Sequence, residues 1–146
     1  PSISSAASAD VYKRQVAVVS TNWNEGIIKP MLEDCLATLG EYNLEEKSFV
    51  VPGAYELPFM AQSLCKNYDA VILLGCIIKG ETPHFEIISQ SISDKVLETS
   101  LNKNVPIIFG VLTTNNESEA KERAAYKGSE FAMSALSILD TLNKIK

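Results

Sequence analysis

Apolar and polar residues alternate along this chain in blocks that predict strands followed by helices. Short β-rich runs predict strands at 16–20, 48–51, 70–74 and 105–112. The third run is apolar at every position, as in a strand covered on both faces. Apolar residues at helical spacing predict helices over 27–39, 57–65, 85–96 and 131–142, and a charged helix is expected over 117–125. This alternation predicts a four-stranded parallel sheet in a three-layer α/β/α sandwich.

Composition is typical of a single domain and narrows the classes of partner. The chain has 146 residues, 46% of them hydrophobic, which suffices for one core. Its net charge of −5 argues against a nucleic-acid or anionic-membrane partner, and no apolar run approaches membrane-spanning length. Cys35, Cys65 and Cys76 have no metal-ligand spacing. In the absence of a signal peptide, we expect them to be reduced thiols of a cytoplasmic protein.

Residues 1–15 differ from the rest of the chain. Residues 1–9 form a Ser/Ala-rich string without periodicity, and residues 10–15 resemble the translated end of a sequencing adapter. We therefore expect a non-native or disordered tail over 1–15 and one domain over 16–146.

Unusual residues follow each predicted strand. The only tryptophan, Trp23, follows the first strand, and the only histidine, His84, follows the third. The segments 52–58 and 113–116 follow the second and fourth. Because parallel strands end at the same edge of a sheet, these segments are expected to converge on one cleft.

Each of these residues has a structural alternative. Trp23 can be a packing residue, and Glu56 can favour a helix N-terminus through its charge. Arg123 can pair with Glu119, four positions earlier. For His84 we expect a place in the first turn of a helix capped by Thr82. There an imidazole is suited to proton transfer, but a structural histidine would give the same sequence signal.

Two motifs after the third strand point to other chemistry. The spacing Gly75-x4-Gly80 approaches the phosphate loop of nucleotide hydrolases, but Glu81 stands where that loop needs lysine. Cys76 could be the nucleophile of a hydrolase with His84 as its base. However, two isoleucines follow Cys76, so the tight turn of a nucleophile elbow is absent.

Several segments together resemble the lumazine synthase family, from Val16 to the C-terminus. They include Val-Pro-Gly-Ala-Tyr-Glu-Leu-Pro at 51–58, Gly-Cys-Ile-Ile-Lys-Gly-Glu-Thr-Pro-His-Phe at 75–85, and the segments 23–24, 109–114 and 119–124. The resemblance implies a flavodoxin-like sheet and a reaction without a cofactor or metal. In that reaction 5-amino-6-(D-ribitylamino)uracil condenses with 3,4-dihydroxy-2-butanone 4-phosphate to give 6,7-dimethyl-8-ribityllumazine, phosphate and water. This is the penultimate step of riboflavin biosynthesis.

The resemblance also implies a role for each matched residue. His84 would be the catalytic proton-transfer residue. The ribitylaminouracil would be contacted by Trp23, Ala54, Tyr55, Glu56, Cys76, Ile77, Ile78 and Phe109. The butanone phosphate would be bound by Glu81, Thr82, Arg123 and Lys127.

The implied assembly is a homopentamer with active sites between adjacent subunits. Phe109 and Arg123 would come from the neighbour of the subunit that supplies His84. In some members twelve pentamers form a hollow icosahedral shell, and riboflavin synthase is a candidate partner. Three features depart from the family pattern: a short connection over 124–126, Lys79 in place of arginine, and the atypical N-terminus. The alternative function is therefore an assembled but weakly active shell, or a binder of flavin-like ligands.

Overall fold

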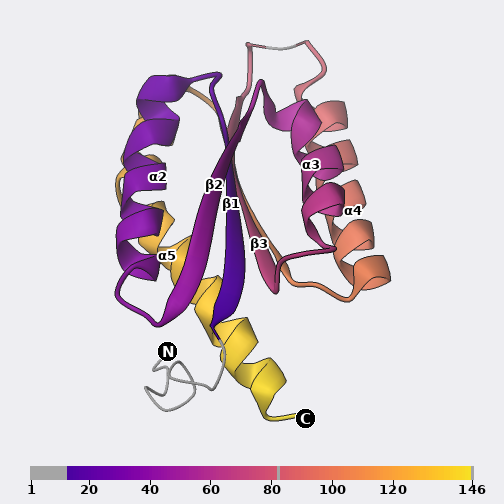
Figure 1. The fold of residues 1–146 in the computed structure, drawn as a ribbon. Coiled ribbons are helices and arrows are strands. Elements are labelled where there is room, and N and C mark those ends of the chain that lie inside the picture. The colour runs from indigo at the N-terminus through magenta and orange to yellow at the C-terminus, as the bar shows by residue number, and fades with distance from the viewer. Residues whose placement is uncertain (1–12, 82, 146) are drawn as a thin grey trace.

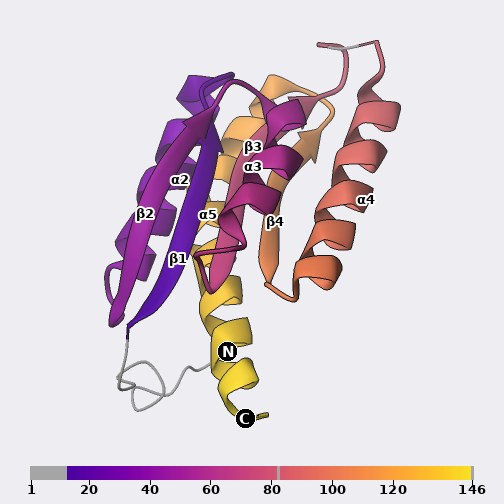
Figure 2. The same cartoon turned by 45° about the vertical axis from the view of Figure 1, so that its right-hand side comes forward.

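The structure is a computed structural model, which describes residues 13–81 and 83–145. Its centre is a sheet whose four strands, all parallel, are β1 (Arg14–Thr21), β2 (Leu44–Val51), β3 (Ala70–Ile78) and β4 (Ile107–Thr114). Their order across the sheet is β2-β1-β3-β4, as Figure 2 shows. The predicted four-stranded parallel, flavodoxin-like sheet is confirmed.

Two pairs of helices cover the sheet (Figure 1). One face carries α2 (Glu25–Leu39) and α5 (Glu117–Asn143), and the other carries α3 (Leu57–Leu64) and α4 (Phe85–Lys103). Successive strand residues point to opposite faces. Val16 and Val18 therefore pack under α2 and α5, whereas Ala17 and Val19 pack under α3 and α4. The expected three-layer sandwich thus has one core on each side of the sheet.

β3 is the strand most completely enclosed by this arrangement. All nine of its residues are buried, which agrees with the unbroken apolar run in the sequence. β2, in contrast, is an edge strand and is mostly exposed, with Glu45, Glu46 and Lys47 along it. Such charges discourage strand pairing between molecules. The apolar sequence of β3 is therefore typical of a central strand, and the charged sequence of β2 is typical of an edge strand.

Several element boundaries differ from the prediction by a few residues, and two of the differences affect how the elements pack. β1 begins at Arg14 rather than Val16, and Gln15 joins it to the chain before β3: its N–H donates to Asp69 Oδ2 at 2.7 Å. The two helices expected on either side of Gly128 are one helix, α5. The prediction of a break was wrong because Gly128 lies inside the helix, packed against the backbone of α2.

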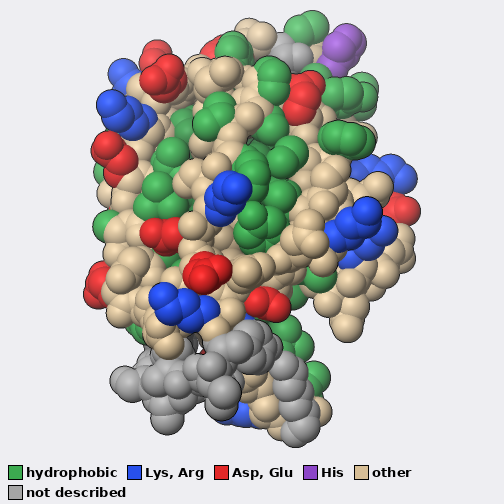
Figure 3. Space-filling model, in the orientation of Figure 1, with side chains coloured by type: hydrophobic (Ala, Val, Ile, Leu, Met, Phe, Trp, Pro, Cys, Tyr) green, Lys and Arg blue, Asp and Glu red, His purple; other side chains and the backbone are tan. Residues whose placement is uncertain are grey.

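No helix in the described part of the chain is long and apolar enough to cross a membrane. Large apolar side chains are nevertheless exposed on β2, on the turn that follows it and on α3, where Val50, Tyr55 and Phe59 are 61%, 72% and 75% exposed. In Figure 3, hydrophobic side chains gather in the middle of the face toward the viewer, among charged ones. An apolar surface of this kind is typical of an interface with another protein.

Candidate functional site

The turns after β1 and β2 lie side by side at the carboxyl edge of the sheet. The N–H of Asn22 donates to the carbonyl of Val51 at 3.0 Å, which joins the two turns. The Thr21 hydroxyl donates to the carbonyl of Trp23 at 3.2 Å, and the Trp23 side chain is 48% exposed. The backbone of Trp23 is thus fixed while its ring remains accessible, as stacking on a flat ligand requires.

The residues expected at the ribityl chain form a short helical turn after β2. This turn, η1 (Ala54–Glu56), leads directly into α3, and Glu56 is the N-cap residue of that helix. The Glu56 N–H donates to the carbonyl of Gly53 at 3.1 Å, while its side chain is exposed and makes no capping hydrogen bond within the described residues. The carboxylate is therefore not used to cap the helix and is accessible to a ligand.

A tight turn closes β3. Gly80 has a φ of 94°, a backbone conformation that favours glycine, and the N–H of Glu81 donates to the carbonyl of Ile78 at 3.2 Å. The N–H of Lys79 donates to the carbonyl of Thr114 at 2.9 Å, which joins this turn to β4. Cys76, Ile77 and Ile78 are buried below it, so the matched residues of β3 present backbone rather than exposed side chains.

Cys76 is unsuited to act as a nucleophile. Burial, with a smaller contribution from the Glu81 carboxylate, raises the pKa of the Cys76 thiol to about 11. The thiolate is the nucleophilic form, and at neutral pH almost none is present at this pKa. The structure thus argues against the cysteine hydrolase. All three cysteines are free and buried.

α4 begins beyond the end of β3 (Figure 1). His84, directly before this helix, is exposed, and its carbonyl accepts the N–H of Ile88 at 2.9 Å. The expected place in the first helical turn was wrong: with φ −114° and ψ 35°, His84 has a non-helical backbone and is the N-cap residue itself. Pro83 consequently precedes the helix, and the expected cap, Thr82, lies outside the described residues.

The start of α5 is fixed by reciprocal hydrogen bonds that sequence analysis did not identify. Asn116 Oδ1 accepts the N–H of Glu119 at 2.9 Å, and Glu119 Oε1 accepts the N–H of Asn115 at 3.0 Å. Side-chain caps of this kind satisfy N–H groups that a helix start leaves without partners. The sequence signal that could have predicted these hydrogen bonds is the three-residue spacing of Asn116 and Glu119, which is typical of a helix start. Glu119 is thus used by the cap, rather than by the expected pair with Arg123.

Arg123 and Lys127, the two candidate phosphate-binding residues of α5, have different surroundings. Arg123 is exposed, and its Nη1 donates to the carbonyl of Thr113 at 3.4 Å. Lys127, one turn later, has its Nζ 3.6 Å from Glu130 Oε1 and 5.8 Å from the centre of the Tyr126 ring. Arg123 therefore lies at the carboxyl edge of the sheet, whereas the Lys127 ammonium is paired further along the helix.

Phe109 is not brought to this edge within one chain. It is the third residue of β4, pairs in register with Leu73, and is half-buried on the side of α3 and α4. Thr114, at the end of the same strand, is roughly 16 Å away at about 3.3 Å per residue. A role for Phe109 at Trp23 would require the Phe109 of another subunit.

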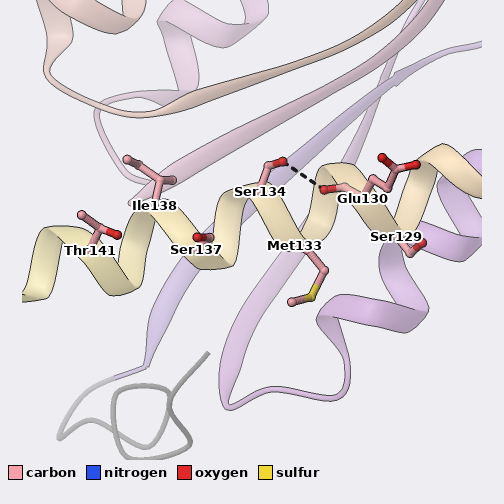
Figure 4. A pocket seen from close by; sticks show the side chains of 7 residues that line it. All are labelled: Ser129, Glu130, Met133, Ser134, Ser137, Ile138 and Thr141. Carbon is pink, nitrogen blue, oxygen red and sulfur yellow. Dashed lines mark hydrogen bonds between the residues drawn. The ribbon is translucent and has the colours of Figure 1, made fainter. Parts of the chain in front are cut away.

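Several candidate side chains, those of Trp23, Glu56, His84 and Arg123, are exposed along this edge. One groove of about 550 Å³ runs along α5, lined by Ser129, Glu130, Met133, Ser134, Ser137, Ile138 and Thr141 (Figure 4). None of these residues is a candidate from the sequence. Among the described residues, no group of three or more His, Cys, Asp or Glu side chains could hold a metal ion. The exposed side chains of the edge can therefore bind and orient small polar molecules.

Comparison with known proteins points to a single family. The family model of 6,7-dimethyl-8-ribityllumazine synthase matches residues 13–143. A protein of that name from Limosilactobacillus reuteri is 37% identical over 138 residues, which cover 92% of this chain and 91% of the relative. Another from Cytophaga hutchinsonii is 41% identical over 135 residues, covering 86% and 85%. A third, from Thermobifida fusca, is 38% identical over 138 residues, covering 90% and 81%.

Proposed function

The chain belongs to the 6,7-dimethyl-8-ribityllumazine synthase family, and from this premise we propose that it catalyses the reaction for which the family is named. It condenses 5-amino-6-(D-ribitylamino)uracil with 3,4-dihydroxy-2-butanone 4-phosphate, a transferase reaction in riboflavin biosynthesis. The observation that supports this most strongly is the convergence of the matched segments on one edge of the sheet. Holding two substrates together there replaces a bimolecular encounter by an oriented reaction.

The roles that we propose follow the chemistry of each side chain. The exposed Trp23 ring stacks on the pyrimidine, and the Glu56 carboxylate accepts hydrogen bonds from the ribityl hydroxyls, beside Ala54 and Tyr55. Buried Cys76, Ile77 and Ile78 contact the pyrimidine through their backbone.

The second substrate needs a site for an anion and a group that moves protons. Arg123 binds the phosphate through its planar guanidinium, near Glu81 and Thr82, and Lys127 adds positive charge. His84 transfers protons during imine formation and phosphate elimination. No step of this account draws on a metal or a cofactor.

We propose further that the site is shared between adjacent subunits of a homopentamer. Two observations support this proposal: the side chains of Trp23 and Tyr55 are exposed in one chain, and Phe109 lies along β4, away from the edge that holds them. The exposed side chains of Val50, Tyr55 and Phe59 supply an apolar surface suited to such contacts. Assembly of pentamers into a shell, and association with riboflavin synthase, are further proposals that depend on this one.

Co-expression of two inactive variants tests the shared site. At a butanone phosphate concentration below the native KM, His84→Ala and Arg123→Ala would each lose most of the activity alone. If the two side chains act from different subunits, mixed pentamers contain some sites with both residues intact, and activity returns to about a quarter of the native value. Mixing the two purified, separately assembled variants is the control, and no recovery is expected. A failure to recover in co-expressed pentamers would place both residues in one chain.

We propose that the catalytic domain, expected over 16–146, also includes Arg14 and Gln15, because both lie in β1, and that the residues before them supply no group to the reaction. Three free, buried thiols are consistent with a reducing compartment, so we propose a cytoplasmic enzyme.

A further inference from the structure

A carboxylate of α2 binds a main-chain N–H in the middle of α5. Asp34 Oδ2 accepts the N–H of Ser129 at 2.6 Å, although the two residues are 95 positions apart. A main-chain N–H inside a helix ordinarily points along the axis, to the carbonyl four residues earlier. Side-chain insertion into this hydrogen-bond ladder is a known cause of local bending in helices. The contact is short, as expected for a charged acceptor.

The two helix backbones meet at the neighbouring residue. A Cβ atom on Gly128 would overlap the carbonyl oxygen of Met31 and lie 2.9 Å from the backbone nitrogen of Cys35. It would also lie 3.0 Å from Cβ of Asp34. Gly128 therefore allows α5 to approach α2, and Asp34 holds it there by a directed hydrogen bond.

The hydrogen bond between Asp34 and Ser129 lies at the C-terminal end of the part of α5 that carries the phosphate-binding candidates. The segment begins at the cap formed by Asn116 and reaches the Asp34 contact at Ser129, with Arg123 between them. Arg123 is exposed, and its Nη1 bond to Thr113 is long, at 3.4 Å. Between these two contacts Ala120 and Ala124 are buried in the core. This packing and the hydrogen bonds at both ends together set the direction of the helix axis, which decides where the guanidinium lies.

We propose that Asp34 is a positioning residue for the phosphate-bearing substrate. Its carboxylate fixes the course of α5 at Ser129, and so keeps Arg123 at the carboxyl end of β4. Asp34 itself touches no substrate. The inference rests on the proposed function, because it assigns Arg123 to the phosphate.

Three variants separate positioning from a general effect on the fold. Asp34→Ala removes the acceptor, Asp34→Asn keeps a neutral oxygen in its place, and Glu33→Ala removes an exposed carboxylate from the same helix as a control. Removing the acceptor is expected to raise KM for the butanone phosphate roughly tenfold and leave KM for the ribitylaminouracil unchanged. Asp34→Asn should fall between Asp34→Ala and the native protein, and Glu33→Ala should match the native protein.

Hydrogen exchange gives a readout that does not depend on the reaction. In Asp34→Ala, the amide exchange of the peptide that contains Ser129 should become faster, as measured by mass spectrometry, while that of β3 stays slow. Unchanged exchange at Ser129 would overturn the anchoring role. Equal changes in both KM values, or a fall in kcat alone, would overturn the positioning role, because a merely structural defect reduces the amount of active enzyme.

Failure of the proposed function would be recognised separately. If the native pentamer forms no lumazine, that function is wrong, and binding of inorganic phosphate then tests Asp34 by calorimetry. A roughly tenfold weaker phosphate affinity in Asp34→Ala than in the native protein would support the inference. Equal affinities, or no phosphate binding by the native protein, would overturn it.

Discussion

The guanidinium of Arg123 reaches from α5 back to β4, where its Nη1 donates to the carbonyl oxygen of Thr113 at 3.4 Å. This contact uses one of the five N–H donors of the side chain. The side chain is exposed, so other donors can face solvent or a ligand. A cation held in this way, at the edge where the strands end, is suited to bind the phosphate of a small substrate.

Replacing Arg123 should therefore weaken binding of one substrate selectively. Loss of a charged hydrogen bond costs about 1.5–3 kcal/mol, so Arg123→Ala should raise KM for the butanone phosphate roughly tenfold to hundredfold. Arg123→Lys keeps the charge without the planar fork and should give an intermediate value. Steady-state kinetics with each substrate varied in turn measures the effect. An unchanged KM for the butanone phosphate would remove Arg123 from the site.

His84 should affect turnover more than binding. Loss of a positioned proton-transfer group lowers kcat by about 10²- to 10⁴-fold, so His84→Ala should lose activity on that scale while both KM values change little. Glu86→Gln is the matched control, because Glu86 is exposed in the first turn of the same helix. Equal activity of the His84 variant and this control would exclude His84 from catalysis.

Cys76 should be dispensable as a reactive group. Its pKa, raised to about 11 by burial and by Glu81, keeps the thiol protonated at neutral pH. Alkylation at pH 7 should therefore be slower than in the unfolded chain. Its rate should rise with pH and level off near pH 11, whereas the rate for the unfolded chain levels off near pH 9. Cys76→Ser should have a mild effect on kcat/KM. Complete loss of activity in this variant, with the fold intact, would instead support the hypothesis that Cys76 is the nucleophile of a hydrolase.

Gly128 should be intolerant of a side chain. Gly128→Ala places a methyl group against the α2 backbone, and overpacking of this kind costs about 1–3 kcal/mol of unfolding free energy. Gly26→Ala is a matched control in a helix, because a Cβ there meets nothing within 4 Å and alanine is the better helix former. Denaturant unfolding should show loss of stability in the first variant only. Equal stabilities would mean that the helices do not pack closely at Gly128.

The sequence predicted the sheet well because its strands differ clearly in hydrophobic pattern. The apolar run of β3 and the Pro-Gly stop after β2 indicate a central strand and a turn without knowledge of the fold. Because the strands are parallel, the segments that follow them lie at the same edge of the sheet, as expected. The prediction failed at Gly128, which was interpreted as a boundary, because the helix interior tolerates glycine where another backbone approaches.

Two features of the site could not be predicted from local pattern. His84 is the N-cap residue because of its own backbone conformation, which the preceding proline does not specify. The Asp34 contact joins residues 95 positions apart, and no periodicity in either helix indicates it. Both depend on tertiary packing, which a single sequence encodes only indirectly.

The most direct test of the central claim is the reaction itself. Purified protein, with its assembly measured by light scattering, is mixed with ribitylaminouracil and butanone phosphate, and lumazine formation is followed by absorbance and fluorescence. The account predicts product formation much faster than the uncatalysed condensation, and loss of that acceleration in His84→Ala. A pentamer that binds substrates without accelerating the reaction would contradict the account and favour a ligand-binding shell.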